Sequence, residues 1–399
     1  MKNLNKKQIL IVLVSTAIII VIVGIILGAN ILKTKILNNN YNSANNGSNN
    51  GNLIPEYIKA GISIGGITGT LENLDTSDAT ATEIDIIYGK TAYVNGEKIE
   101  GLFVPRTSLK VGDYVSYSPD TASTYSIAST SSGYKSNQTI EQETLTWKIL
   151  SINDDGTIDL ISSNPINQIL YLRGAQGYNN GVYLLNDICA KQYSNKEFGI
   201  TARSITKDDI EKKLNETGIK AKDNFYSDGN IKNGDSKTYT VDGQRYYPNL
   251  YAYENGSGIN TTEVKADGIG RSESYYTKPT TETYSKASKS LTVTQNYYFF
   301  VNLNTLNYFD DTDFFELIFG LEQEYWLASR FYICNEFQAN FGVCYVSEYD
   351  LANYTLFKSD CTYEERGCSI RPVVTLESNI QLYGGDGSVD HPYKLRIWN

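Results

Sequence analysis

The sequence predicts an α+β head domain, because segments with the period-two alternation of strands occur together with segments of helical periodicity. Residues 109–117 alternate apolar and polar side chains, and residues 147–162 do so on both sides of an Asp-Asp-Gly turn, which is typical of a β-hairpin. Residues 181–193 instead place apolar side chains on one helical face. Residues 206–215 begin with a near capping box and predict a second helix, and a third, short helix is expected over 313–321.

Charge and histidine content exclude several classes of function. The 399 residues include 45 acidic and 35 basic side chains, giving a net charge of −10, which argues against binding the phosphate backbone of a nucleic acid. The single histidine, His391, excludes zinc sites built from several histidines and argues against a histidine-activated nucleophile. We therefore expect no nucleic-acid partner, no metal site and no cofactor.

Cysteine and tyrosine usage each leave two interpretations open. Cys189 stands apart, and the other four cysteines lie near the C-terminus without metal-ligand spacing: Cys334, Cys344, Cys361 and Cys368. Two disulfides within this cluster or free thiols both fit the pattern. The chain has 32 Tyr against 13 Phe and 3 Trp, a composition that suits binding surfaces and that an AT-rich codon bias would also produce.

The N-terminal region predicts a membrane anchor. Residues 9–29 are apolar and uncharged, and about 20 such residues suffice for a helix to cross a bilayer. More lysines precede this run than follow it, which favours a cytoplasmic N-terminus and an extracellular location for the bulk of the chain. We predict that residues 1–37 form a single-pass anchor in the cell membrane, with a cleaved secretion signal as the alternative. Residues 38–52, rich in Asn, Gly and Ser, predict a flexible linker.

Two short β modules are expected between the linker and the head, over residues 53–107. Residues 58–71 and 86–103 share glycine-bounded apolar alternation, and the second segment contains an Asn-Gly hairpin signal at Asn95. They resemble units that recur in phage-tail and bacterial surface proteins. That resemblance implies presentation of a head on a stalk and no chemistry of its own.

The head, predicted over 108–399, ends in three strand-like pieces separated by polar, aromatic-rich insertions: residues 325–330, 341–346 and 369–376. Their order resembles the end of the C-type-lectin-like fold, in the branch that includes formylglycine-generating enzymes and uncharacterised bacterial surface proteins. The resemblance is carried by Trp326, Ser329, Phe341, Gly342, Val343, Arg371, Pro372 and Val373. These motifs bear on fold more than on function.

The chain departs from both well-defined functions of that fold. The copper-holding cysteine pair of the oxidising enzymes has no recognisable counterpart, and the calcium-binding motifs of sugar-binding lectins do not occur. Neither catalysis nor calcium-dependent sugar binding is therefore carried over, and we predict that the protein is not an enzyme. A formylglycine-generating activity stays as a remote alternative.

The insertions are more similar to those of variable proteins of diversity-generating retroelements, in which residues reachable from Asn codons are scattered over a binding face. We predict a receptor or adhesin whose ligand, an extracellular protein or a glycan, contacts the loops of 331–363, with or without such diversification. The predicted ligand-binding residues are Phe331, Tyr332, Asn335, Tyr345, Tyr349, Asp350, Asn353, Tyr354 and Tyr363. A structural cell-envelope or pilus-like protein without a dedicated ligand is the alternative.

Overall fold

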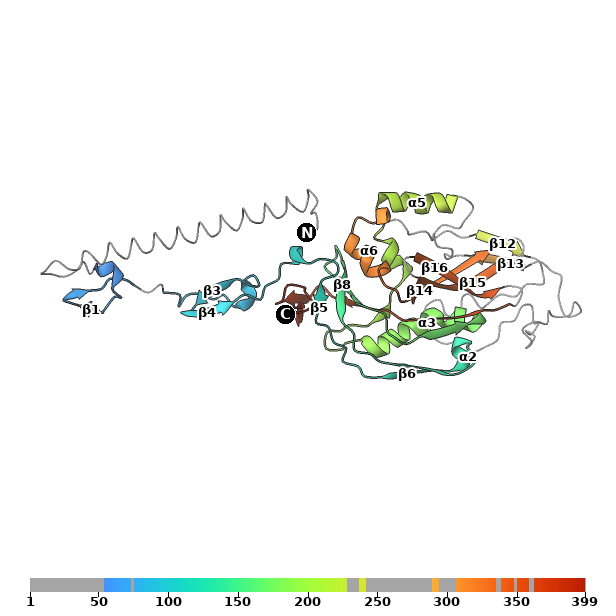
Figure 1. Ribbon diagram of the computed structural model, residues 1–399, viewed down its shortest axis with the longest axis horizontal. Coiled ribbons are helices and arrows are strands. Elements are labelled where there is room, and N and C mark those ends of the chain that lie inside the picture. The colour runs from blue at the N-terminus through green and yellow to red at the C-terminus, as the bar shows by residue number, and fades with distance from the viewer. Residues whose placement is uncertain are drawn as a thin grey trace, which may run out of the picture. The chain divides into compact units, whose positions relative to one another are not determined.

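The computed structural model describes eight stretches of the chain: residues 54–72, 75–227, 237–241, 289–293, 306–334, 339–347, 350–358 and 362–398 (Figure 1). The predicted anchor at 9–29 and the linker at 38–52 lie outside these residues. Within the described stretches, no helix has both the length and the apolar content that crossing a membrane requires. The chain divides into two compact units, Met1–Ala79 with Val94–Glu97, and Thr80–Tyr93 with Lys98–Asn399.

The first unit includes a small hairpin module. A 3₁₀ turn, η1 (Pro55–Tyr57), leads into β1 (Ser63–Ile64) and β2 (Ile67–Thr68), which pair antiparallel. The turn between them is Gly65-Gly66, where both residues have positive φ, a conformation that glycine adopts without steric cost. Ile58 is buried, whereas Ile64 is 49% exposed, so this module has very little core of its own.

A second hairpin follows, as the sequence predicted. β3 (Thr91–Val94) and β4 (Glu97–Glu100) pair around Asn95 and Gly96, which both have positive φ, as a tight Asn-Gly turn requires. The 3₁₀ turns η2 (Glu83–Asp85) and η3 (Arg106–Ser108) flank this hairpin. Leu102 accepts a backbone hydrogen bond of 2.7 Å from Gly384, which joins this segment to the C-terminal hairpin.

The second unit contains a five-stranded antiparallel sheet and several smaller sheets, with few helices. The strand order of the five-stranded sheet is β11-β18-β9-β8-β5. The strands are β5 (Tyr114–Val115), β8 (Trp147–Ile152), β9 (Ile158–Ser162), β11 (Arg203–Ser204) and β18 (Pro372–Leu376). β8 and β9 form the predicted hairpin, in which Asp155 serves the turn by accepting from the Thr157 amide at 2.9 Å.

A three-stranded antiparallel sheet carries the predicted ligand loops. It consists of β14 (Tyr325–Cys334), β15 (Ala339–Ser347) and β16 (Asp350–Lys358), with β15 in the centre. The described part of the second unit also contains four two-stranded sheets besides the β3–β4 hairpin. They are β6 (Thr124–Ile127) with β7 (Gln138–Glu141), β10 (Leu170–Arg173) with β17 (Glu365–Cys368), β12 (Lys237–Val241) with β13 (Lys289–Val293), and β19 (Ile380–Tyr383) with β20 (Lys394–Ile397).

The longest described helix, α3 (Gly174–Tyr193), starts seven residues before the predicted position of 181. The difference comes from its glycines, which have low helix propensity but allow close packing. A Cβ atom on Gly177 would lie 3.1 Å from the Leu172 carbonyl carbon, and one on Gly181 would lie 3.0 Å from the Leu172 side chain. Tertiary contact therefore outweighs local propensity here.

The helix predicted over 206–215 is shorter than predicted. α4 (Lys207–Glu211) begins with the predicted capping box, in which Thr206 and Asp209 exchange hydrogen bonds, but it ends at Glu211. A separate helix, α5 (Glu216–Ser227), follows beyond the predicted range and was not predicted. The third predicted helix is confirmed as α6 (Thr312–Phe319), and a short α2 (Ser129–Ser132) was not predicted.

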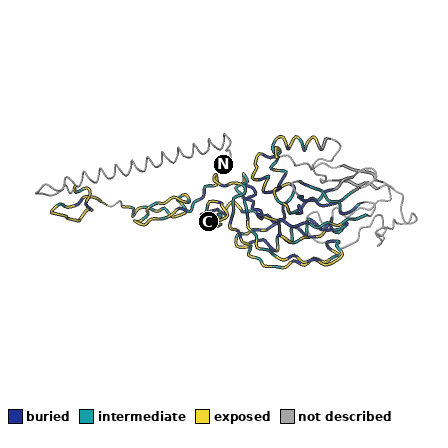
Figure 2. Tube along the Cα trace, in the orientation of Figure 1, coloured by how far each residue is buried: buried dark blue, intermediate teal, exposed yellow. Residues whose placement is uncertain are grey.

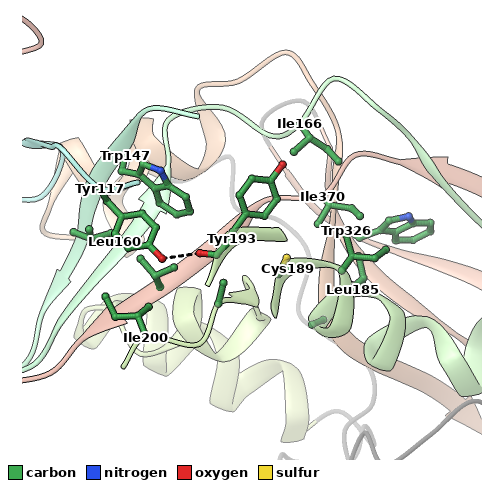
Figure 3. Close-up of a cluster of buried hydrophobic side chains, with 14 of the residues drawn as sticks. Tyr117, Trp147, Leu160, Ile166, Leu185, Cys189, Tyr193, Ile200, Trp326 and Ile370 are labelled. Atoms are coloured by element: carbon green, nitrogen blue, oxygen red, sulfur yellow. Dashed lines mark hydrogen bonds between the residues drawn. The ribbon is translucent and has the colours of Figure 1, made fainter. Parts of the chain in front are cut away.

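Two apolar clusters lie on opposite faces of the sheets, because successive side chains of a strand point to opposite sides. Leu160 joins one cluster and Ile161 the other, and Val374 and Val373 divide in the same way. Figure 2 shows the buried residues gathered in these strands. In the cluster of Figure 3, the Tyr117 hydroxyl donates to the Tyr193 carbonyl at 2.6 Å.

Candidate ligand-binding face

The meander of β14, β15 and β16 places the predicted site residues at two separate ends. Its pairing brings Cys334 opposite Ala339 at one end, whereas Val346 and Leu351 pair near the other. Strands of nine or ten residues rise about 3.4 Å per residue, so the two ends are roughly 30 Å apart. One small ligand cannot contact both ends, and a compact site must therefore use one of them.

Phe331 and Tyr345 belong to the interior of the sheet. Phe331 is 1% exposed, and a Cβ on the cross-strand Gly342 would lie 2.3 Å from its ring. Tyr345 is 9% exposed and makes an edge contact with Trp326, with 6.1 Å between the ring centroids. These two rings fix the positions of the strands and offer little surface to a ligand.

Tyr354 on the outer strand β16 is half-buried and is held by Arg366 of β17. The guanidinium carbon of Arg366 lies 5.0 Å from the Tyr354 ring centroid and 4.2 Å from that of Tyr345, so the cation stacks against two tyrosines. One Arg366 terminal nitrogen also contacts both carboxylate oxygens of Glu324, at 2.6 and 2.7 Å. Burial and then the nearby Glu364 carboxylate raise the pKa of Tyr354, so its hydroxyl stays protonated at neutral pH.

Tyr363 lies toward the end of the sheet at which β14 and β16 finish. It forms an isolated bridge with Phe357, and the Arg173 guanidinium carbon stacks 4.4 Å from its ring centroid. Asn353 faces the other side of β16, where the Cys344 thiol donates to its side-chain oxygen at 3.4 Å. Tyr363, Tyr354 and Asn353 are all half-buried, so each retains exposed surface for a ligand.

The remaining four predicted residues are placed only in part. Tyr332 pairs with Phe341, and Asp350 pairs with Ser347 at the other end, but the side chains of Tyr332 and Asp350 lie outside the described residues. Asn335 and Tyr349 lie wholly outside them. By connectivity, Asn335 follows the end of β14 and Tyr349 precedes β16.

Six charged residues of this face were missed, and all of them form ion pairs. The pairs are Arg173–Glu365 at 3.6 Å, Lys358–Glu364 at 3.0 Å and Arg366–Glu324 at 2.6 Å. A signal was present, since Glu364, Glu365 and Arg366 directly follow Tyr363 in the sequence. Their partners come from positions up to 192 residues away along the chain, which no local pattern reveals.

In the part of the chain whose side chains the structure describes, the cysteines are buried and protonated at neutral pH. Cys189, Cys344 and Cys368 are free and buried, and burial raises the pKa of Cys344 and of Cys368 to about 12, so these thiols are poor nucleophiles at neutral pH. Over the same part of the chain, no three His, Cys, Asp or Glu side chains are grouped so that they could hold a metal ion. Cys334 and Cys361 have side chains outside it.

Comparison with known proteins yields no relative. No protein-family model matches the chain, and neither the curated proteins nor the solved structures include a significant match. A functional assignment therefore depends on this chain's own residues.

Proposed function

We propose that the chain is a membrane-anchored extracellular binding protein, a receptor or adhesin, with its ligand face on a C-type-lectin-like head. The observation that carries the proposal is the stacking of Arg366 and Arg173 on the half-buried rings of Tyr354 and Tyr363. A tyrosine ring held by such a contact has little conformational freedom before a ligand arrives, so binding costs less side-chain entropy. The partly exposed ring offers apolar surface to a ligand.

Within the predicted range of 331–363, we place the ligand at the end where β14 and β16 finish. Tyr363 and the Lys358–Glu364 pair gather there. Asp350 belongs to the opposite end and is not expected to touch the same ligand. The ion-paired surface has little net charge, which suits a protein or a neutral glycan better than a polyanion.

The test is binding of the full chain to an array of extracellular proteins and glycans. The double variant Tyr354→Ala/Tyr363→Ala is expected to lose at least tenfold in affinity for every array component that the wild type binds. Tyr93→Ala is the matched control, because Tyr93 is 64% exposed in β3 and lies outside the face. Unchanged affinity in the double variant, or an equal loss in the control, would refute the proposal.

Diversification of the face is a separate part of the proposal. It predicts that DNA near the gene holds a near-copy of the segment coding for 325–376 beside a reverse transcriptase, with mismatches confined to template adenines. Comparing several isolates should then show changes at codons such as those of Tyr354 and Tyr363 and none at Phe331, whose ring is buried. An invariant segment without a template would leave a receptor of fixed specificity.

A structural role in the cell envelope is the second candidate. It is favoured by the first hairpin module, where Tyr57 is 79% exposed and Ile62 and Ile64 are each 49% exposed. A module with so much apolar surface and so little core commonly depends on a neighbour for cover. Crosslinking in intact cells distinguishes the two functions: a structural protein should yield only copies of itself or wall components.

A further inference from the structure

A cavity of about 490 Å³ lies within the second unit, between α6 and the region of β5, β8 and β9. It is distinct from the face of Tyr354 and Tyr363, because none of its lining residues belongs to β14, β15, β16 or β17. The lining residues are Val111, Gly112, Asp113, Lys148, Ser163, Asp313, Glu316, Leu317, Gly320 and Leu321. A volume of this size is typical of sites for small ligands.

One wall of the cavity is a single stripe along α6. Asp313, Glu316 and Leu317 recur at the spacing that places side chains on one face of a helix, and Gly320 continues the stripe. Asp313 and Glu316 are exposed, and neither forms an ion pair with any described residue. The helix therefore presents two uncompensated carboxylates to the cavity.

The opposite wall adds a third carboxylate. Asp113 accepts a hydrogen bond of 2.8 Å from the Lys110 amide. Burial raises the pKa of Asp113, and the hydrogen bonds from Lys110 and Tyr393 and the charge of Lys110 oppose that rise; the charge of Asp313 raises the pKa only weakly. A positively charged group placed between these two walls would relieve their repulsion.

Ser163 supplies a second, independent sign that the cavity is built for a ligand. It is 9% exposed, and its side-chain oxygen has no hydrogen-bond partner among the described residues. Its backbone amide donates to Thr146 and its carbonyl accepts from Arg371. The hydroxyl is therefore the one polar group of Ser163 that has no partner among the described residues, and it lies buried in the wall of the cavity, where an unpaired hydroxyl is costly.

The lysine that lines the cavity contacts an aromatic ring rather than a described carboxylate. The Lys148 ammonium lies 4.8 Å from the Tyr114 ring centroid, and it forms no ion pair with a described carboxylate. Three carboxylates and one lysine line the cavity, and Lys110 adds a second positive charge near Asp113, so negative charge is still in excess. Val111, Leu317 and Leu321 supply apolar wall between the charged groups.

We propose that this cavity is a second binding site, for a short aliphatic ligand that carries an ammonium group. The ammonium would lie against Asp313 and Glu316 on α6, and its alkyl chain would rest on Val111 and Leu317. A bare metal ion fits less well, because in the described stretches no three carboxylates come close enough together to coordinate one. A free diamine and the lysine side chain of a peptide share this chemistry.

The experiment measures cadaverine (1,5-diaminopentane) binding to the full chain by calorimetry. We expect the double variant Asp313→Asn/Glu316→Gln to weaken cadaverine binding by at least tenfold, and each single variant by about threefold. Glu322→Gln is the matched control, since Glu322 is exposed just beyond α6 and does not line the cavity. It should bind cadaverine as the wild type does.

Further ligands test whether the amine is the group recognised, and whether it comes from a free diamine or from a lysine side chain of a protein. Norleucine, with an alkyl side chain but no side-chain amine, should bind at least tenfold more weakly than lysine. A capped peptide with one lysine, compared with its Nε-acetylated form, tests whether the site takes the lysine side chain of a protein. If that peptide binds more tightly than cadaverine, the natural ligand is a partner protein's lysine. Absence of cadaverine binding, or binding that the double variant leaves unchanged, would overturn the proposal.

Discussion

The face around Tyr354 and the cavity beside α6 both combine charged with apolar side chains, but they satisfy their charges differently. On the face, Arg366 has its own carboxylate partner, as do Arg173 and Lys358. In the cavity, Asp313 and Glu316 have no such partner within the described chain. Paired charges hold aromatic rings in place and contribute little net field, whereas unpaired charges demand a counter-ion.

The difference predicts two kinds of recognition. Binding at the face should depend on shape and hydrogen bonds and respond weakly to salt, because its charges are neutralised before a ligand arrives. Binding at the cavity should weaken as ionic strength rises, because exposed carboxylates attract a cation over distances that salt screens.

The largest effect is expected at Arg371, which supports both regions. This fully buried side chain donates to the carbonyl of Leu317 at 2.7 Å in α6, to Ser162 at 3.1 Å, and to the hydroxyl of Tyr325 at 3.1 Å in β14. Arg371→Met should lower the free energy of unfolding by about 3–5 kcal/mol, because these buried acceptors lose their donor. Denaturant titration measures the loss.

The control for that variant is an arginine with similar contacts at the surface. The exposed Arg106 donates to three carbonyls of the turn between β8 and β9, those of Asn153, Gly156 and Thr157. Arg106→Met should cost only about 1 kcal/mol, since water can replace the lost donor. Equal losses in the two variants would contradict the importance that we assign to burial.

Gly342→Ala should disrupt the face and spare the cavity. The new Cβ would lie 1.9 Å from the Tyr354 carbonyl oxygen and 2.3 Å from the Phe331 ring, so β16 must move. We expect a loss of about 1–3 kcal/mol in the free energy of unfolding, together with weaker binding to array components. Thr355→Ala, opposite Gly342 in register, removes atoms and should cost less than about 1 kcal/mol.

Glu324→Gln breaks one charge pair without changing side-chain size. Arg366 loses its carboxylate partner, and its stack against Tyr345 and Tyr354 should loosen. Both side chains of the pair are partly exposed, so the expected loss is about 0.5–1 kcal/mol by thermal unfolding. Glu322→Gln, which breaks no described pair, should leave stability unchanged, and an equal loss there would show that the pairing is unimportant.

The smallest effect concerns pH at Asp113. Because its pKa is raised in the folded protein, mainly by burial, the folded state holds this proton more tightly than the unfolded state. The resulting stability is present below about pH 4 and is lost as the pH rises through the folded-state pKa. After allowance for solvent screening, wild type should lose a few tenths of a kcal/mol relative to Asp113→Asn over that range. Parallel pH-dependence curves would contradict this.

Local patterns predicted the elements whose cause is local. The hairpin at Asn95-Gly96, the β8–β9 hairpin and α6 follow from turn glycines, alternation and helical periodicity. The early start of α3 was missed because Gly177 is there for packing against Leu172. The early end of α4 at Glu211 was likewise not visible in the apolar pattern of 206–215.

The candidate site was predicted only as a region. Composition identified tyrosines of the insertions, but it could not separate the buried Phe331 from the half-buried Tyr354, because burial depends on register against Gly342. The ion pairs that hold the face join residues distant in sequence. The cavity was missed for the same reason, since its walls unite an early strand region at Asp113 with a helix two hundred residues later.

The most direct test of the central claim is one crossed affinity measurement. The full-length wild type, the Tyr354→Ala/Tyr363→Ala variant and the Asp313→Asn/Glu316→Gln variant are each titrated with the tightest array component and with cadaverine. We predict that the tyrosine variant binds the array component at least tenfold more weakly than wild type and binds cadaverine with unchanged affinity. The carboxylate variant should bind cadaverine at least tenfold more weakly and the array component with unchanged affinity. A tyrosine variant that binds the array component as tightly as wild type would contradict the account.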